Sequence, residues 1–164
     1  MGLPDRRRVH PAGRRAGVSR SYEDPAAPGA YNICNFNALQ AQEDAEDDWD
    51  PDLLLRDADG KVVRDEEWNE AVLDIRTAAK RERVASRVNG WIDECAAKGY
   101  QAVEPDNYDT FTRFPDHLTA GQAKAFMKLL SAHAHAKGPA VWWWSGGEGR
   151  APAVVRSGVV EWAV

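Results

Sequence analysis

The chain has 164 residues, of which 43% are hydrophobic and 29% charged, and its formal net charge is -5. This length is enough for one domain with a hydrophobic core, but a complete eight-unit α/β barrel typically needs about 250 residues. The acidic balance argues against nucleic acid as a partner, and the sequence has no apolar run of the length that predicts a membrane span.

The cysteines and histidines do not predict a disulfide framework or a metal site. The two cysteines, Cys34 and Cys95, lie far apart in the chain, so they define neither a disulfide framework nor a CxxC metal site. Cys95 falls on the apolar face of a predicted helix, and we expect it to be a buried thiol. The four histidines show no metal-ligand spacing with the cysteines, so no metal site is predicted.

The N-terminal segment, residues 1–29, is rich in arginine, proline, glycine and alanine and has no period of 2 or 3.6. We predict that it is a disordered basic segment. A basic arm that binds nucleic acid is the weaker alternative. The segment lacks the apolar run of a signal peptide, so the sequence shows no export signal.

Short strands and a hairpin are predicted next. The alternation over 31–36 favours a strand, and the polar, acidic residues 37–52 indicate an ordered loop. Asp57-Ala58-Asp59-Gly60 is a turn signal between the apolar run 53–55 and the segment Lys61-Val62-Val63, which indicates a small hairpin. Residues 72–75 predict another short strand.

Two amphipathic helices follow. Thr77 is a good N-cap, apolar residues recur at helical spacing after it, and Gly99 ends the pattern, which predicts a helix over about 78–98. The strand 100–104 comes next. Thr119 and Gln122 then form a capping-box pattern at the start of a second helix, which Gly138 closes before a further apolar run. This order predicts an α/β fold with parallel strands and crossover helices.

The C-terminal residues 142–164 give no clear element, and we predict an irregular tail. Three consecutive tryptophans, Trp142–Trp144, suggest a platform for stacking on sugars. However, consecutive side chains of a strand point to alternate sides, so these three cannot form one flat surface. The platform is therefore the weaker interpretation.

Carboxylates gather after the strand 100–104. Glu104 and Asp106 lie two apart at its end and would share a face in extended backbone, which Pro105 favours for the residue before it. Carboxylates at the end of a strand within a helix–strand–helix unit are typical of acid/base sites in α/β barrels. Hydrolysis of a glycosidic bond usually uses two such groups. The plainer alternative is a turn, where Asp and Asn are common.

These motifs resemble glycoside hydrolase family 114, the endo-α-1,4-polygalactosaminidase family. Asp106-Asn107 after Gly99–Pro105, with Leu73-Asp74-Ile75-Arg76 one unit earlier, carries the resemblance. Further matching pieces are Pro28–Cys34, Pro51–Asp57, Cys95–Tyr100 and Ala134–Gly138, so the resemblance covers roughly Pro28 to Val141.

The resemblance implies a TIM barrel that hydrolyses α-1,4-linked galactosamine polymers without a metal or an organic cofactor. Asp106 is then the first catalytic candidate and Glu104 the second. The resemblance further implies that substrate would be held by Asp74, which would line the cleft from the preceding strand, and by Asn107, Asp109 and Tyr108. An acidic cleft would suit a polycationic amino sugar. Full-length members resemble secreted or cell-surface enzymes.

The resemblance also implies that part of the barrel is absent. We expect a first barrel strand before Tyr31 and three strands after Val141, one of which would carry the second catalytic carboxylate. We therefore predict an incomplete (β/α)8 barrel of about half the usual size over residues 30–141. The ends, 1–29 and 142–164, are hypothesised to be read out of the ancestral frame. Such a chain would be a weakly active or inactive hydrolase, or alternatively a carbohydrate-binding fragment without turnover.

Overall fold

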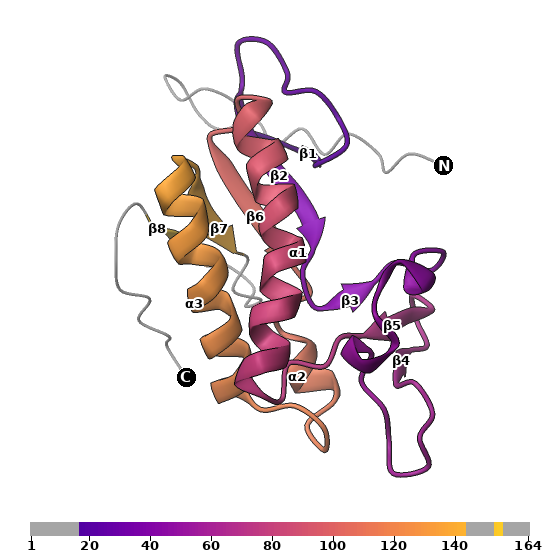
Figure 1. Ribbon diagram of the computed structural model, residues 1–164. Coiled ribbons are helices and arrows are strands. Elements are labelled where there is room, and N and C mark those ends of the chain that lie inside the picture. Colours follow the sequence, from indigo (N-terminus) through magenta and orange to yellow (C-terminus); the bar gives the residue numbers. More distant parts are fainter. Residues whose placement is uncertain (1–16, 144–152, 156–164) are drawn as a thin grey trace. The chain divides into compact units, whose positions relative to one another are not determined.

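The computed structural model describes residues 17–143 and 153–155, and the order of its elements can be followed in Figure 1. These residues divide into two compact units. Within the described ranges, the first unit holds residues 17–36, 91–105, 134–143 and 153–155, and the second holds residues 37–90 and 106–133.

Five strands form the larger sheet, and most of their residues belong to the first unit. Strands β1 (Gly17–Ser21) and β2 (Tyr31–Asn37) are parallel, as are β6 (Ala102–Asp106) and β7 (Ala140–Trp143). The order in the sheet is β1-β2-β6-β7-β8, and β8 (Ala153–Val155) is antiparallel to β7. The predicted strand 100–104 is thus confirmed with a shift of two residues.

Backbone hydrogen bonds set the direction of β6 beside β2. At one end, the N–H of Gln101 donates to the carbonyl of Asn32 at 3.0 Å. At the other, the N–H of Ala38 donates to the carbonyl of Asp106 at 3.0 Å. Both strands therefore run the same way and end together, which is the arrangement that the α/β prediction requires.

A disulfide between Cys34 and Cys95 corrects the prediction of a buried free thiol. Cys34 lies on the face of β2 that also buries Asn32 and Phe36, and Cys95 lies on helix α1 (Ala78–Ala97). Their Cα atoms are 6.0 Å apart, within the range that a disulfide needs. The sequence could not reveal the pair, because 61 positions separate the two residues and only the fold brings them together.

Helices α1 and α3 (Ala120–Lys137) confirm the predicted helices closely. The capping box at the start of α3 is formed in both directions: the N–H of Thr119 donates to Gln122 Oε1 at 2.9 Å, and the N–H of Gln122 donates to Thr119 Oγ1 at 3.2 Å. Of the apolar positions that predicted the two helices, Trp91 is half-buried and the others are buried, namely Val84, Val88, Ile92, Cys95, Ala123, Phe126, Met127, Leu130 and Ala134.

The second unit contains a small antiparallel sheet. Its order is β3 (Gln40–Ala41), β5 (Glu70–Val72), β4 (Arg64–Asp65), and two short 3-10 helices, η1 (Glu46–Asp48) and η2 (Pro51–Leu53), lie in the acidic segment. The predicted turn at Asp57 is confirmed, because Gly60 has a φ of 80° and the N–H of Asp57 donates to the carbonyl of Lys61. A bridge between Arg56 and Val62 completes the hairpin.

The predicted strand 72–75 does form extended structure, but not as part of the parallel sheet. Strand β5 is antiparallel to both of its neighbours, and Leu73 continues it with an antiparallel bridge to Leu54. The parallel strand that precedes α1 is therefore β2, and residues 38–77 are a long insertion between them. A short apolar run cannot show which sheet it will join.

The predicted limits of ordered structure need correction at both ends. Strand β1 lies inside the segment predicted to be disordered, and β7 and β8 include part of the predicted irregular tail. Strand β1 has only half-buried and exposed side chains and is held by its backbone ladder to β2, so it carries no hydrophobic alternation. Residues 1–16, 144–152 and 156–164 lie outside the described residues.

The short helix α2 (Thr110–Arg113) was not predicted. It directly follows the Glu104–Asp109 segment and is too short to show a helical period. None of the helices in the described part of the chain is long and apolar enough to cross a membrane.

Candidate active site

The carboxyl ends of β2 and β6 come together in the second unit. Asn37 is the last residue of β2 and Asp106 the last of β6, and the hydrogen bond from Ala38 N–H to the Asp106 carbonyl joins the two ends. The Asp106 side chain is exposed, and its Oδ1 accepts the N–H of Asn107 at 2.9 Å. An α/β barrel places its reactive groups at this end of its strands.

Glu70 brings a second carboxylate to these strand ends. Its Oε2 accepts hydrogen bonds from Asn37 Nδ2 at 2.8 Å and from Asn107 Nδ2 at 3.4 Å. The same Asn107 amide donates to Asn37 Oδ1 at 3.1 Å, which closes a three-residue network. Asn37, Glu70 and Asn107 are therefore held in fixed positions around the end of β6.

The segment after Asp106 is fixed by a second set of contacts. Asn107 has a φ of 58°, a left-handed conformation that asparagine tolerates better than most residues. The hydroxyl of Thr110 donates to the Asn107 carbonyl at 2.6 Å, and Arg113 Nη2 donates to Asn107 Oδ1 at 3.0 Å. Arg113 also forms ion pairs with Asp65 at 3.1 Å and with Asp109 at 3.3 Å.

Burial and neighbouring charges change how two of these groups titrate. Burial raises the pKa of Glu70, hydrogen bonding from Asn37 partly offsets this, and the charges of Asp65 and Asp106 raise the pKa further. Burial also raises the pKa of Tyr108 to about 12, with the charges of Asp109 and Asp106 acting in the same direction. Tyr108 therefore keeps its phenolic proton at neutral pH.

Asp74 lies in different surroundings from those that the sequence predicted. It follows the antiparallel strand β5, and only 1% of its surface is exposed. Arg76 donates to it from Nε and Nη2, each at 2.9 Å, and Lys80 Nζ lies 2.7 Å from Oδ2. Burial alone would raise the pKa of Asp74, but these hydrogen bonds outweigh it and hold the pKa at about 2. Asp74 is thus ion-paired with Arg76 and Lys80 at the start of α1, and its role in lining a substrate cleft stays a prediction.

Glu104 belongs to the first unit, where it contacts the neighbouring strands. Its Oε2 accepts a hydrogen bond from the hydroxyl of Ser19 on β1 at 2.8 Å and one from Nδ2 of Asn35 on β2 at 3.4 Å. The side chain is half-buried.

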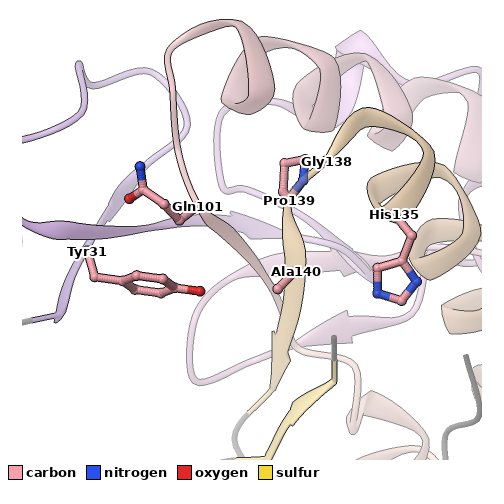
Figure 2. Close-up of a pocket in the computed structure, with 6 residues that line it drawn as sticks. All are labelled: Tyr31, Gln101, His135, Gly138, Pro139 and Ala140. Atoms are coloured by element: carbon pink, nitrogen blue, oxygen red, sulfur yellow. The ribbon is translucent and has the colours of Figure 1, made fainter. Parts of the chain in front are cut away.

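A hollow in the first unit lies at the other end of the strands. Figure 2 shows its lining residues, Tyr31, Gln101, His135, Gly138, Pro139 and Ala140. Tyr31 and Ala140 are the first residues of β2 and β7, and Gln101 directly precedes β6. Since this is the amino-terminal end of the parallel strands, the hollow is not the place where a barrel holds its catalytic groups.

Sequence reasoning missed three residues of this network, Asn37, Glu70 and Arg113. Asn37 could have been found, because it is a polar residue at the end of a predicted strand. Glu70 arrives from the β4–β5 hairpin, and no local pattern connects it to Asp106. Within residues 17–143 and 153–155, no group of three or more histidine, cysteine or acidic side chains is arranged to hold a metal ion.

Carboxylates and amides at the carboxyl ends of parallel strands are the arrangement in which α/β-barrel glycoside hydrolases place their site groups. The family model of glycoside-hydrolase family GH114 matches residues 17–156, so the chain belongs to this family. The match starts earlier and ends later than the limits Pro28 and Val141 that the sequence suggested. The hypothesis that both ends are read out of frame was motivated by the limits of the resemblance, and the wider match removes that motivation for residues 17–29 and 142–156. A comparison with curated proteins found no match.

Solved structures of glycoside hydrolases resemble the chain. Ega3 of Aspergillus fumigatus, solved in complex with galactosamine, is 25% identical with a TM-score of 0.55, over 69% of this chain and 42% of that one. The glycoside hydrolase domain of PelA from Pseudomonas aeruginosa is 17% identical, with a TM-score of 0.46 over 72% of this chain and 44% of that one. The α-galactosidase TtGalA of Thermus thermophilus is 19% identical, with a TM-score of 0.47 over 70% and 25%.

The fold is therefore α/β and corresponds to part of a TIM barrel, as the sequence predicted. The chain spans less than half the length of Ega3.

Proposed function

We propose that this chain carries part of a site that hydrolyses α-1,4-linked galactosamine-type polysaccharide by carboxylate acid/base catalysis. The observation that supports it best is the exposed Asp106 at the carboxyl end of β6. Its carboxylate accepts the N–H of Asn107, whose side chain is hydrogen-bonded in the Asn37–Glu70–Asn107 network. Membership of GH114 and the likeness to Ega3, solved with galactosamine, point to the same chemistry.

Asp106 is the proposed catalytic carboxylate, and Glu104 remains the second candidate on the same strand. Tyr108 and Asp109 are proposed to bind substrate. No metal or organic cofactor is part of this proposal.

Asn107 has a more specific role in this proposal than substrate binding. In its side-chain amide, Nδ2 donates to Asn37 and Glu70, and Oδ1 accepts from Arg113. An amide group engaged in this way has little hydrogen-bonding capacity left for a sugar. We therefore assign Asn107 to positioning Asp106, whose carboxylate accepts its backbone N–H.

The acidic groups near Asp106 support a cationic substrate. Asp65 and Asp106 both act on Glu70 through their charges, and Asp109 lies three positions after Asp106. A surface of one charge raises the local concentration of ligands of the opposite charge. A polymer of galactosamine carries ammonium groups, whereas an acetylated polymer does not, so affinity should fall on acetylation and at high salt.

The test is reducing-end release from deacetylated galactosamine polymer by the wild-type chain and by Asp106→Asn. The substitution should lower turnover by at least about a hundredfold, in line with the usual contribution of general acid/base catalysis, while leaving the thermal melting unchanged. Asp59→Asn, at an exposed turn, is the matched control and should keep full activity. Retained turnover above a few per cent in Asp106→Asn would remove that residue from the catalytic role.

Binding without hydrolysis is the second candidate function. It is favoured by the span of the chain, which covers 42% of Ega3, so that a second catalytic carboxylate could belong to the part of that relative which this chain does not match. Measuring binding of the deacetylated polymer beside its hydrolysis separates the two. Affinity without reducing-end release would establish a carbohydrate-binding role.

The disulfide supports a location outside the reducing cytosol. Disulfides form and persist in secreted proteins and at cell surfaces, and both cysteines of this chain are used in the bond. We therefore propose an oxidising compartment. Thiol labelling of the protein from its native source would contradict this if it found both cysteines free.

A further inference from the structure

Trp68 is unusually open to solvent. It is 61% exposed, and Leu129, at 37%, is the other large hydrophobic side chain of the described residues left in this state. Tryptophan is rarely so exposed, because burying its ring is more favourable than for almost any other side chain. An exposed indole therefore suggests contact with a ligand.

The turn that carries Trp68 is held in place. It connects β4 to β5, and the N–H of Glu67 donates to Asp65 Oδ1 at 3.2 Å. Arg64 Nη1 contacts the carbonyl of Asn69 at 3.4 Å, and Arg64 also pairs with Glu46. Asn69 Nδ2 donates to Glu43 Oε1 at 3.0 Å. These contacts on both sides of Trp68 give the turn a defined conformation, so little ordering would be needed on binding.

The same turn leads directly to the candidate active site. Trp68 is two residues before Glu70, whose carboxylate contacts Asn37 and Asn107. Two residues of extended chain span at most about 7 Å, so the backbone of Trp68 lies near that of Glu70. Glu70 contacts Asn107, whose backbone N–H donates to Asp106, so a short series of contacts connects this turn to the proposed catalytic carboxylate.

The neighbours of Trp68 are acidic. Glu66 and Glu67 are both exposed and precede it in the turn. An indole face attracts cations, with most effect where carboxylates add to the negative potential. The cores of protein–protein interfaces, in contrast, are depleted in glutamate and aspartate. This composition favours a cationic sugar over a protein as the partner.

We propose that Trp68, together with Glu66 and Glu67, forms a further subsite that binds a second amino-sugar unit of the polymer. The indole would stack on the sugar and attract its ammonium group, and the two carboxylates would add charge. This subsite rests on the proposed function, because it extends the binding of the same polymer beyond the unit at Asp106.

The test compares the binding of two probes, galactosamine itself and a deacetylated α-1,4-galactosamine oligomer, by titration calorimetry on the full chain. Trp68→Ala should raise the Kd for the oligomer roughly tenfold, the size expected for loss of a cation–π contact. It should leave the Kd for galactosamine unchanged. Trp68→Phe should keep most of the affinity, and Leu129→Ala, which truncates the other exposed side chain, should have no effect.

The outcomes separate this subsite from the proposed function. If the wild-type chain binds neither probe, the proposed function fails and the subsite fails with it. If the wild type binds the oligomer and Trp68→Ala binds it equally well, the subsite is refuted and the proposed function stands. If Trp68→Ala changes only self-association in size-exclusion chromatography, the side chain belongs to a protein contact, and the subsite is again refuted.

Discussion

Reducing the disulfide between Cys34 and Cys95 should remove a large share of the stability of this protein. The bond encloses a long stretch of chain, since 61 positions separate its cysteines. Cross-linking a loop of this length lowers the entropy of the unfolded chain by an amount equivalent to about 4 kcal/mol at 25 °C. The free energy of unfolding of a domain is usually about 5–15 kcal/mol, so the disulfide would supply a large fraction of the total.

The assay is urea unfolding of the oxidised and the reduced protein, followed by tryptophan fluorescence. Trp91 is a suitable reporter because it stacks on Tyr22, with ring centroids 5.2 Å apart, and lies beside Phe36. With a typical denaturant slope of about 2 kcal/mol per M, the midpoint should fall by about 2 M on reduction.

A variant without either sulfur is the control for this experiment. Cys34→Ala/Cys95→Ala should unfold near the midpoint of the reduced wild type and should not respond to reductant. A midpoint change below about 0.5 M on reduction of the wild type, well under the loop-entropy value, would refute the reasoning. So would an equal response of the double variant, because reductant would then act elsewhere.

Two further predictions concern carboxylates. Asp74→Asn should lower the free energy of unfolding by about 2 kcal/mol at pH 7, because the pKa of Asp74 is about 2 in the folded protein and ordinarily 3.8. This contribution is present above pH 3.8 and is lost as pH falls through 2, so the thermal melts of the variant and the wild type should converge between pH 7 and pH 2. Asp52→Asn, which breaks an exposed pair with Arg83, should melt like the wild type throughout. Glu70→Gln should have a melting temperature at pH 7 equal to or above that of the wild type. A carboxyl group whose pKa is raised by folding stabilises the fold at low pH and loses that contribution as pH rises, so a lower melting temperature at pH 7 would contradict the burial argument. In calorimetry, the same variant should bind deacetylated galactosamine polymer more weakly.

Much of the fold could be predicted because its helices carry their own signals. The apolar stripe from Val84 to Cys95 and the capping box at Thr119 set the limits of α1 and α3 to within about a turn, since both depend on neighbours in sequence. Strand β1 could not be found in this way, because it is held by a backbone ladder and its side chains have no buried face.

Only those residues of the candidate site that directly follow strand β6 in the chain could be predicted. Asp106, Asn107 and Asp109 follow a strand, and that position points to the carboxyl end of a sheet. Glu70 and Arg113 reach it through tertiary contacts that leave no local pattern. Asp74 shows the converse, because it follows a short apolar run like the end of a barrel strand, yet that run pairs in the antiparallel sheet and its carboxylate is paired with Arg76 and Lys80.

The antiparallel pairing of β8 with β7 decides how more of a barrel could join this sheet. In a barrel, the free side of β7 would receive the next parallel strand, but here Val141, Trp142 and Trp143 are already paired with residues of β8. A complementary half-barrel supplied as a separate chain would first have to displace β8. Strand exchange of this kind is slow compared with simple docking, so complementation would be limited by the opening of one edge and would not depend linearly on the concentration of the partner.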